Sequence, residues 1–88
     1  MLEGGQSKMT REEALAWLAN VFEAAPEDIR ADTPRDEIGG WDSLGVLTLM
    51  AELDEKFEIR PDAEEMTAMT NVTDILAMLE RHGALAAE

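Results

Sequence analysis

Apolar residues recur at helical spacing in three segments of this 88-residue chain, and no other feature restricts the fold as much. The clearest run follows Asp42-Ser43, and its apolar face consists of Val46, Met50, Leu53 and Phe57 at positions i, i+4, i+7 and i+11. Similar spacing occurs over residues 11–25 and in the segment after Asn71. A chain of this length buries only about 60–65% of its unfolded surface, so it has room for one modest core. We therefore predict a single all-α domain.

Local signals give the limits of the predicted helices. Thr10 and Glu13 have the spacing of a capping box, and Pro26 cannot continue a helix, so the first helix is expected over residues 11–25. Asn71 is expected to cap the last helix and Gly83 to end it in a left-handed conformation. The expected core stripes are Ala14, Leu15, Leu18, Val21, Phe22 and Ala25 in the first helix, and Val72, Ile75, Leu76 and Leu79 in the last.

Residues 26–42 show no helical period, and this connection is longer than the usual two to eight residues between packed helices. Ile29, Ile38 and Trp41 are spaced as anchors to a core, and Gly39-Gly40 permits a sharp turn, so we predict an ordered loop. An Asp-x-x-Glu start at Asp62 predicts a short helix of one or two turns before the last one. The expected domain is residues 10–83, between a flexible leader at 1–9 and a flexible tail at 84–88.

The formal net charge is −13, from 7 basic and 20 acidic residues. Such a surface repels nucleic acids and attracts basic protein partners, so nucleic-acid binding is not expected. The chain has no cysteine, which excludes disulfides and thiol chemistry from the polypeptide itself. No apolar run reaches the length of a membrane span, so we expect no stable membrane insertion and a cytoplasmic location. We also expect a monomer. No metal site is expected, because the spacing of an EF-hand calcium loop does not occur.

Ser43 lies at the junction of the long loop and the second helix. A serine hydroxyl needs a neighbouring base to act as a nucleophile, and the only histidine, His82, falls at the end of the last helix, where it suits the helix dipole. We therefore do not expect an enzyme. Two interpretations remain open from these residues: Ser43 is a helix cap, or it is an exposed handle for chemistry carried out by another protein.

The chain resembles the acyl carrier protein family, which includes peptidyl and D-alanyl carrier domains. The resemblance covers residues 10–83 and is strongest at Gly40-Trp41-Asp42-Ser43-Leu44 with the helix that follows. It extends to Pro26-Glu27-Asp28-Ile29, Asp32-Thr33-Pro34, Ile59-Arg60-Pro61-Asp62 and Asn71-Val72-Thr73-Asp74. It implies a four-helix bundle of three longer helices and a short third helix, with a long first loop.

The resemblance also implies a cofactor, 4′-phosphopantetheine, which a separate phosphopantetheinyl transferase moves from coenzyme A to a serine with the help of magnesium. Ser43 matches that serine, and Asp42 and Leu44 match the residues that present it to partners. The thiol of the arm would hold acyl groups as thioesters, which a chain without cysteine cannot do alone. The expected partners are the transferase and the enzymes that load and transfer acyl groups in fatty acid, polyketide or related biosynthesis.

The second helix is expected to contact these partners. More of its surface is apolar than one core stripe needs, so Leu44, Val46 and Leu47 are candidates for docking. By resemblance, the acidic residues Glu52, Asp54 and Glu55 are candidates for contacts with basic enzyme surfaces. Compared with the carriers of fatty acid synthesis, the chain has Gly45 and Thr48 where acidic residues are usual and Lys56 within the acidic end, so a specialised pathway is predicted.

By resemblance, a cargo would either stay solvated or enter a cavity between helices, for which Leu47, Met50, Met66 and Met69 are the candidate walls. Core filling by the methionines is the simpler interpretation. The alternative function, from another class, is an acidic helical module that binds basic partners without any modification.

Overall fold

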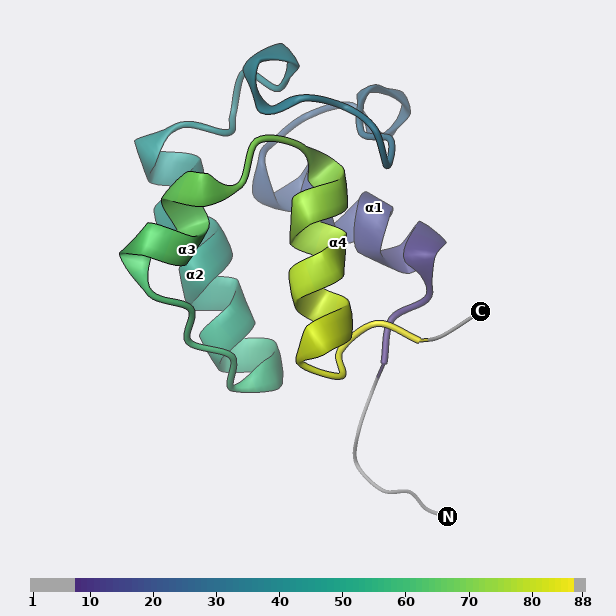
Figure 1. Cartoon of the computed structure of the whole chain (residues 1–88). Helices are drawn as coiled ribbons and strands as arrows, with labels where there is room; N and C mark the ends of the chain where they lie inside the picture. The colour runs from purple at the N-terminus through teal and green to yellow at the C-terminus, as the bar shows by residue number, and fades with distance from the viewer. Residues whose placement is uncertain (1–7, 87–88) are drawn as a thin grey trace.

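The computed structural model describes residues 8–86, and four α-helices form the fold of this part of the chain (Figure 1). They are α1 (Arg11–Val21), α2 (Ser43–Phe57), α3 (Ala63–Ala68) and α4 (Val72–Arg81). Two 3-10 turns, η1 (Pro26–Asp28) and η2 (Arg35–Glu37), lie in the long connection between α1 and α2. Residues 8–86 contain no β-strand beyond isolated bridges, so the predicted all-α bundle with a short third helix is confirmed.

Helix α1 begins as predicted but ends early. The Glu13 amide donates to Thr10 Oγ1 at 3.1 Å and the Thr10 amide donates to Glu13 Oε1 at 3.0 Å, which completes the capping box. The predicted end near residue 25 was wrong, because Glu23 adopts a left-handed conformation with φ +54°. The amides of Glu23 and Ala24 then bond to the carbonyls of Asn20 and Ala19, so the helix closes before Pro26, and Ala25 is exposed.

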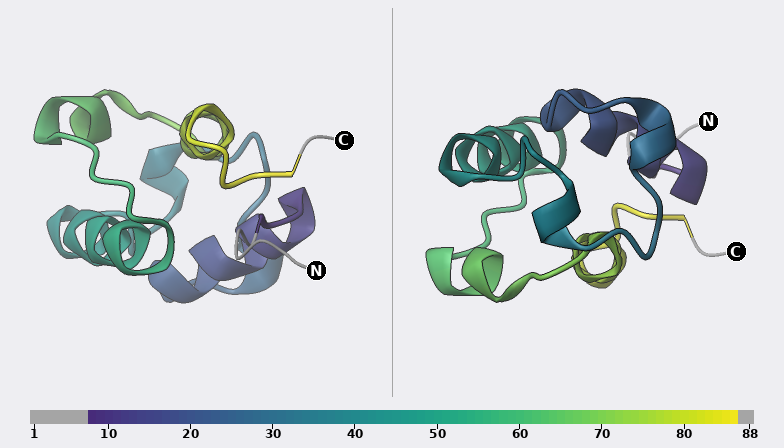
Figure 2. Two further views of the ribbon diagram at one scale, coloured as in Figure 1. Left: turned by 90° about the horizontal axis from the view of Figure 1, so that it is seen from below. Right: turned by 90° about the horizontal axis from the view of Figure 1, so that it is seen from above.

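The loop between α1 and α2 is ordered, as predicted. Its three expected anchors, Ile29, Ile38 and Trp41, are all buried. The Arg35 amide donates to the Thr70 carbonyl at 2.8 Å and the Val72 amide donates to the Thr33 carbonyl at 3.0 Å. These bonds tie the loop to the connection between α3 and α4, so the loop lies across one end of the bundle (Figure 2).

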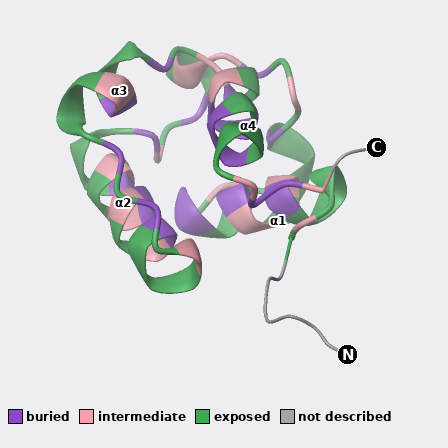
Figure 3. Cartoon of the chain, turned by 60° about the horizontal axis from the view of Figure 1, so that its bottom comes forward, coloured by how far each residue is buried: buried purple, intermediate pink, exposed green. Residues whose placement is uncertain are grey.

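The buried residues form one core cluster, and Figure 3 colours their positions along the helices and the loop. The predicted stripe of α4 is confirmed, and Met78 joins it. In α2 the buried face is turned from the predicted one: Leu49 and Leu53 are fully buried, whereas Val46, Met50 and Phe57 are only partly covered. The last helix starts at the Asn71 cap and stops at Gly83 with φ +77°, as predicted.

Both ends of the predicted domain need correction. Ala84 and Leu85 are buried, and the Met9 amide donates to the Ala84 carbonyl at 2.9 Å while the Ala86 amide donates to the Met9 carbonyl at 2.7 Å. The predicted leader and tail therefore pair with each other at residues 9 and 84–86, because apolar side chains there cover the core. Residues 1–7 and 87–88, the remainder of the predicted flexible segments, lie outside the described residues.

No helix in the described part of the chain has both the length and the apolar composition required to cross a membrane.

Candidate functional site

The structure places Ser43 at the first position of α2 with its side chain exposed. Asp42 is the cap of this helix, since its Oδ1 accepts a hydrogen bond from the Gly45 amide at 2.9 Å. This separates the two interpretations that the sequence left open. Capping is done by the aspartate, so the serine hydroxyl is not used for it.

Close backbone packing fixes the start of α2. A Cβ added at Gly40 would lie 1.8 Å from the Phe22 carbonyl oxygen, and one added at Gly45 would lie 1.9 Å from the Gly40 carbonyl oxygen. The end of α1, the loop and the first turn of α2 therefore touch through main-chain atoms. Neither glycine has a positive φ, so it is the absence of a side chain that the fold requires at both positions.

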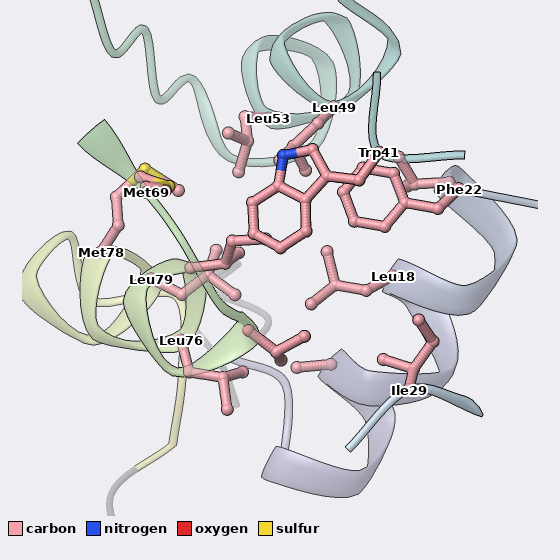
Figure 4. Packing of buried hydrophobic residues seen from close by; sticks show 14 of the residues in the cluster. Leu18, Phe22, Ile29, Trp41, Leu49, Leu53, Met69, Leu76, Met78 and Leu79 are labelled. Atoms are coloured by element: carbon pink, nitrogen blue, oxygen red, sulfur yellow. The ribbon is translucent and has the colours of Figure 1, made fainter. Parts of the chain in front are cut away.

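Trp41, directly before the capping aspartate, is the main anchor under the site. Its ring stacks on Phe22 with 5.2 Å between centroids and 11° between planes, and Figure 4 shows both rings packed against Leu18 and Leu49. Only 4% of Trp41 is exposed, which agrees with the predicted packing role. Its indole Nε1 is buried and has no hydrogen-bond partner in the described residues, so packing and not a bond of this nitrogen holds the ring.

A pocket of about 320 Å³ adjoins Ser43 between α2 and α3. Apolar side chains from both helices line it, and Arg35 of η2 completes its wall; the lining residues are Arg35, Ser43, Val46, Leu47, Met50, Ala63, Met66 and Thr67. Three of the four predicted cavity residues, Leu47, Met50 and Met66, therefore meet beside the serine. Met69 does not join them, because it lines an adjacent hollow of about 730 Å³ with Ile38 and Trp41. Arg35 and Thr67 line both spaces.

No histidine is placed to activate the serine. His82 is the C-cap of α4, and α4 ends at the opposite end of the bundle from the start of α2 (Figure 1). Within residues 8–86, no group of three histidine, cysteine or acidic side chains is placed to hold a metal ion. The geometry offers an exposed hydroxyl on a rigid support beside a groove.

The model of a family described as "Phosphopantetheine attachment site" matches residues 13–79, which run from the first turn of α1 to the last turns of α4. The chain belongs to this family. No curated protein and no solved structure matches the chain significantly. The family carries covalently attached 4′-phosphopantetheine, so the chain is a phosphopantetheine-carrying carrier. Carrier domains of this type are substrates of a phosphopantetheinyl transferase and interact with biosynthetic enzymes.

The described residues of this carrier fit such a group. An attached arm needs a hydroxyl that a second protein can reach, and Ser43 is exposed at a helix start with exposed neighbours. The arm and its cargo also need a surface along which to lie, and the groove next to Ser43 is lined mainly by apolar atoms of α2 and α3. Such a lining suits the methylene groups of an acyl chain.

Two apolar residues of the carrier stand out beside the serine. Leu44 is 72% exposed and Leu47 is 63% exposed, and they are the large apolar side chains that α2 leaves uncovered. Val46 is partly buried in the groove wall. The expectation that part of the apolar surface of α2 stays outside the core is confirmed, whereas its use for docking stays a prediction.

The three acidic candidates of the carrier differ in what they contact. Glu52 is partly buried and accepts a hydrogen bond from Trp17 Nε1 at 3.2 Å, so it also holds α1 against α2. Asp54 pairs with Arg60 at 2.8 Å, and both side chains are well exposed. Glu55 is exposed. Of the three, Glu52 has a structural role that the sequence did not reveal, because Trp17 is 35 residues away in the chain.

Gly45, taken in the sequence as a departure from carriers of fatty acid synthesis, has a structural cause here. The residue is buried under the Phe22 ring and the Gly40 carbonyl, so an acidic side chain has no space at this position. Thr48 donates from Oγ1 to the Leu44 carbonyl at 2.9 Å, within its own helix. Thr48 and Lys56 therefore remain the departures from carriers of fatty acid synthesis that have no such packing cause.

Proposed function

We propose that this chain is an acyl carrier protein in which Ser43 bears the 4′-phosphopantetheine arm. The observation that carries this assignment is the exposed Ser43 hydroxyl at the start of α2, left uncommitted because Asp42 caps the helix. The chain has one other serine, Ser7, and Ser43 alone lies in the Asp-Ser-Leu sequence. When bound, the arm supplies a thiol that holds acyl groups as thioesters.

In the proposed loading step, Ser43 Oγ forms a bond to the phosphorus of the phosphopantetheine half of coenzyme A. The pyrophosphate bond of coenzyme A breaks, adenosine 3′,5′-bisphosphate leaves, and a base of the transferase takes the hydroxyl proton. The carrier contributes position: Asp42 fixes the first turn of α2, and the packing of Gly40 on Phe22 holds that turn against α1. The N-terminus of α2, where Ser43 lies, also favours the negative charge of the phosphodiester that results.

The proposed docking surface is α2 itself. Leu44 and Leu47 would enter apolar depressions of a partner near the serine, and Asp54 and Glu55 would meet basic side chains further along the helix. The net charge of −13 supports both steering of basic partners and a monomeric carrier, since like-charged copies repel one another. The proposed partners are the transferase and enzymes that load and transfer acyl groups.

The proposed cargo is an acyl group of fatty acid, polyketide or related specialised biosynthesis. The groove between α2 and α3 supports it, because Leu47, Met50 and Met66 offer an apolar wall next to the arm. Thr48 and Lys56 support a specialised pathway, since they remove negative charge from the helix that partners would contact.

The experiment that tests the assignment is intact-mass measurement. The purified chain, with Ser43→Ala and Ser7→Ala as matched variants, is incubated with coenzyme A, magnesium and a broad-specificity transferase. We expect one phosphopantetheine on the parent chain and on Ser7→Ala, and none on Ser43→Ala. Addition to Ser43→Ala would refute the assignment of the site. If several transferases leave a demonstrably folded chain unchanged, the chain is better explained as an acidic interaction module that works unmodified.

A further inference from the structure

Arg35 is a cation beside the proposed attachment site that the assignments above do not use. It lies in η2, is partly buried, and lines the same 320 Å³ pocket as Ser43. The sequence places the two residues eight positions apart, with no signal that they meet. The loop brings them together because its backbone folds over the start of α2.

The Arg35 side chain is held in a defined position. Its Nε donates to the Trp41 carbonyl at 3.4 Å, and its guanidinium carbon lies 5.6 Å from the centre of the Trp41 ring. Trp41 is in turn stacked on Phe22, and the Arg35 amide is bonded to the Thr70 carbonyl at 2.8 Å. A cation fixed at its backbone and at its guanidinium loses little further freedom when it binds an anion.

This guanidinium has capacity left to bind. Among the described residues, Nε is the one nitrogen of the Arg35 side chain with a protein acceptor, and no carboxylate lies within ion-pair distance of that side chain. In the part of the chain that the structure describes, Arg60 pairs with Asp54 and Arg81 pairs with Glu65, whereas Arg11, Arg30 and Arg35 have no carboxylate partner. Of these three arginines, Arg35 is the one that lines the pocket of Ser43. The chain has 20 acidic residues, yet the Arg35 side chain has none of them as an ion-pair partner within the described residues. Because it lines the same pocket as Ser43, it is suited to bind an anion that becomes attached to that serine.

We propose that Arg35 binds the phosphodiester of the prosthetic arm through its terminal Nη groups and thereby turns the arm towards the groove between α2 and α3. The inference rests on the proposed attachment at Ser43, which brings one phosphodiester charge to the pocket that Arg35 lines. Arginine donates to phosphate oxygens with two parallel N–H groups, which fixes direction as well as distance. From there the arm runs past Val46, Leu47 and Met50 rather than into solvent. Arg35 is thus a positioning residue for the arm.

A direct test uses the parent chain, labelled with ¹⁵N at arginine, before and after loading with an arm that ends in its free thiol. The phosphodiester is then the only anion added, so an acidic cargo cannot cause the effect. We expect the Nη resonances of Arg35 to shift and to separate as rotation about the guanidinium slows, while those of Arg30, an exposed arginine of the same loop, stay unchanged. Equal behaviour of the two arginines would overturn the proposal.

A second test observes the phosphorus. The loaded parent chain, Arg35→Gln and Arg30→Gln are compared by ³¹P spectroscopy after intact mass has established that each is loaded. The two variants change the net charge equally, so only a local contact separates them. We expect a displaced phosphorus resonance in Arg35→Gln alone, and three coincident resonances would refute the contact. Should Arg35→Gln fail to fold or load, the arginine spectra of the parent chain decide the question. Failure of the parent chain to load refutes the attachment itself and is recognised first, in the mass spectrum.

Discussion

Replacement of Gly40 by alanine tests whether main-chain packing holds the start of α2. The added Cβ would lie 1.8 Å from the Phe22 carbonyl oxygen and 2.7 Å from the carbonyl carbon. Real Cβ contacts are not shorter than 3.0 Å, so the loop and the end of α1 must separate by more than 1 Å. No change of rotamer relieves this contact, because both partners belong to the backbone.

The expected loss of stability is about 3 kcal/mol, the upper part of the usual range for overpacking, since the backbone itself must move. For a domain of this size each kcal/mol lowers the melting temperature by about 4–8 °C, so Gly40→Ala should melt about 12–24 °C lower. The separation would also loosen the stacking of Trp41 on Phe22, so loading of Ser43 should slow beyond what the unfolded fraction explains.

Gly39 provides the matched control one residue away. A Cβ there meets nothing within 4 Å, and its φ is not positive, so Gly39→Ala should leave the fold intact. It should even stabilise the chain by about 0.5 kcal/mol, because alanine restricts the unfolded chain more than glycine does. Urea unfolding followed by far-ultraviolet circular dichroism measures both variants. Equal stability of Gly40→Ala and Gly39→Ala would refute the close approach of the loop to α1.

Three further predictions concern the ends of the chain and α2. Leu85→Ala should lower the free energy of unfolding, measured by urea unfolding, by about 2 kcal/mol, because Leu85 is only 8% exposed. An unchanged value would show that this end of the chain is a flexible tail, as the sequence predicts. Glu52→Ala should cost about 1 kcal/mol in the same assay, since Trp17 Nε1 loses its acceptor, whereas Glu55→Ala should change stability by less than about 0.5 kcal/mol; equal effects would remove the structural role of Glu52. Leu47→Gln should keep stability within about 0.5 kcal/mol yet slow loading in a mass time course, and an unchanged rate would exclude docking through this side chain.

Much of the fold could be predicted because its signals are local. The capping pairs at Thr10, Asp62 and Asn71 act within three residues of sequence, and each is present in the structure. The stripe of α4 is narrow, so its period alone identifies the buried face. The same holds for the anchors Ile38 and Trp41, which are isolated apolar residues in a polar loop.

The predictions that failed depended on contacts between distant segments. The end of α1 is set by Glu23 in a left-handed conformation, for which the sequence offers no glycine as a signal. The apolar surface of α2 is too broad for its period to choose a face, and packing against α1 and the loop buried Leu49 instead of Val46. Leu85 falls in the predicted flexible tail, and the sequence gives no sign that it pairs with Met9 at the other end of the chain.

The sequence by itself determined that this chain is a small helical carrier with a serine at the start of its second helix, because periodicity, caps and the motif around Ser43 are all properties of neighbouring residues. Only the tertiary structure decided that Asp42 does the capping, that Gly40 and Gly45 must lack side chains, and that Arg35 shares a pocket with Ser43. These features arise where α1, the loop, α2 and α3 meet. Contacts between segments that are distant in the sequence depend on packing in three dimensions, and they cannot be predicted from the spacing of residues along the chain.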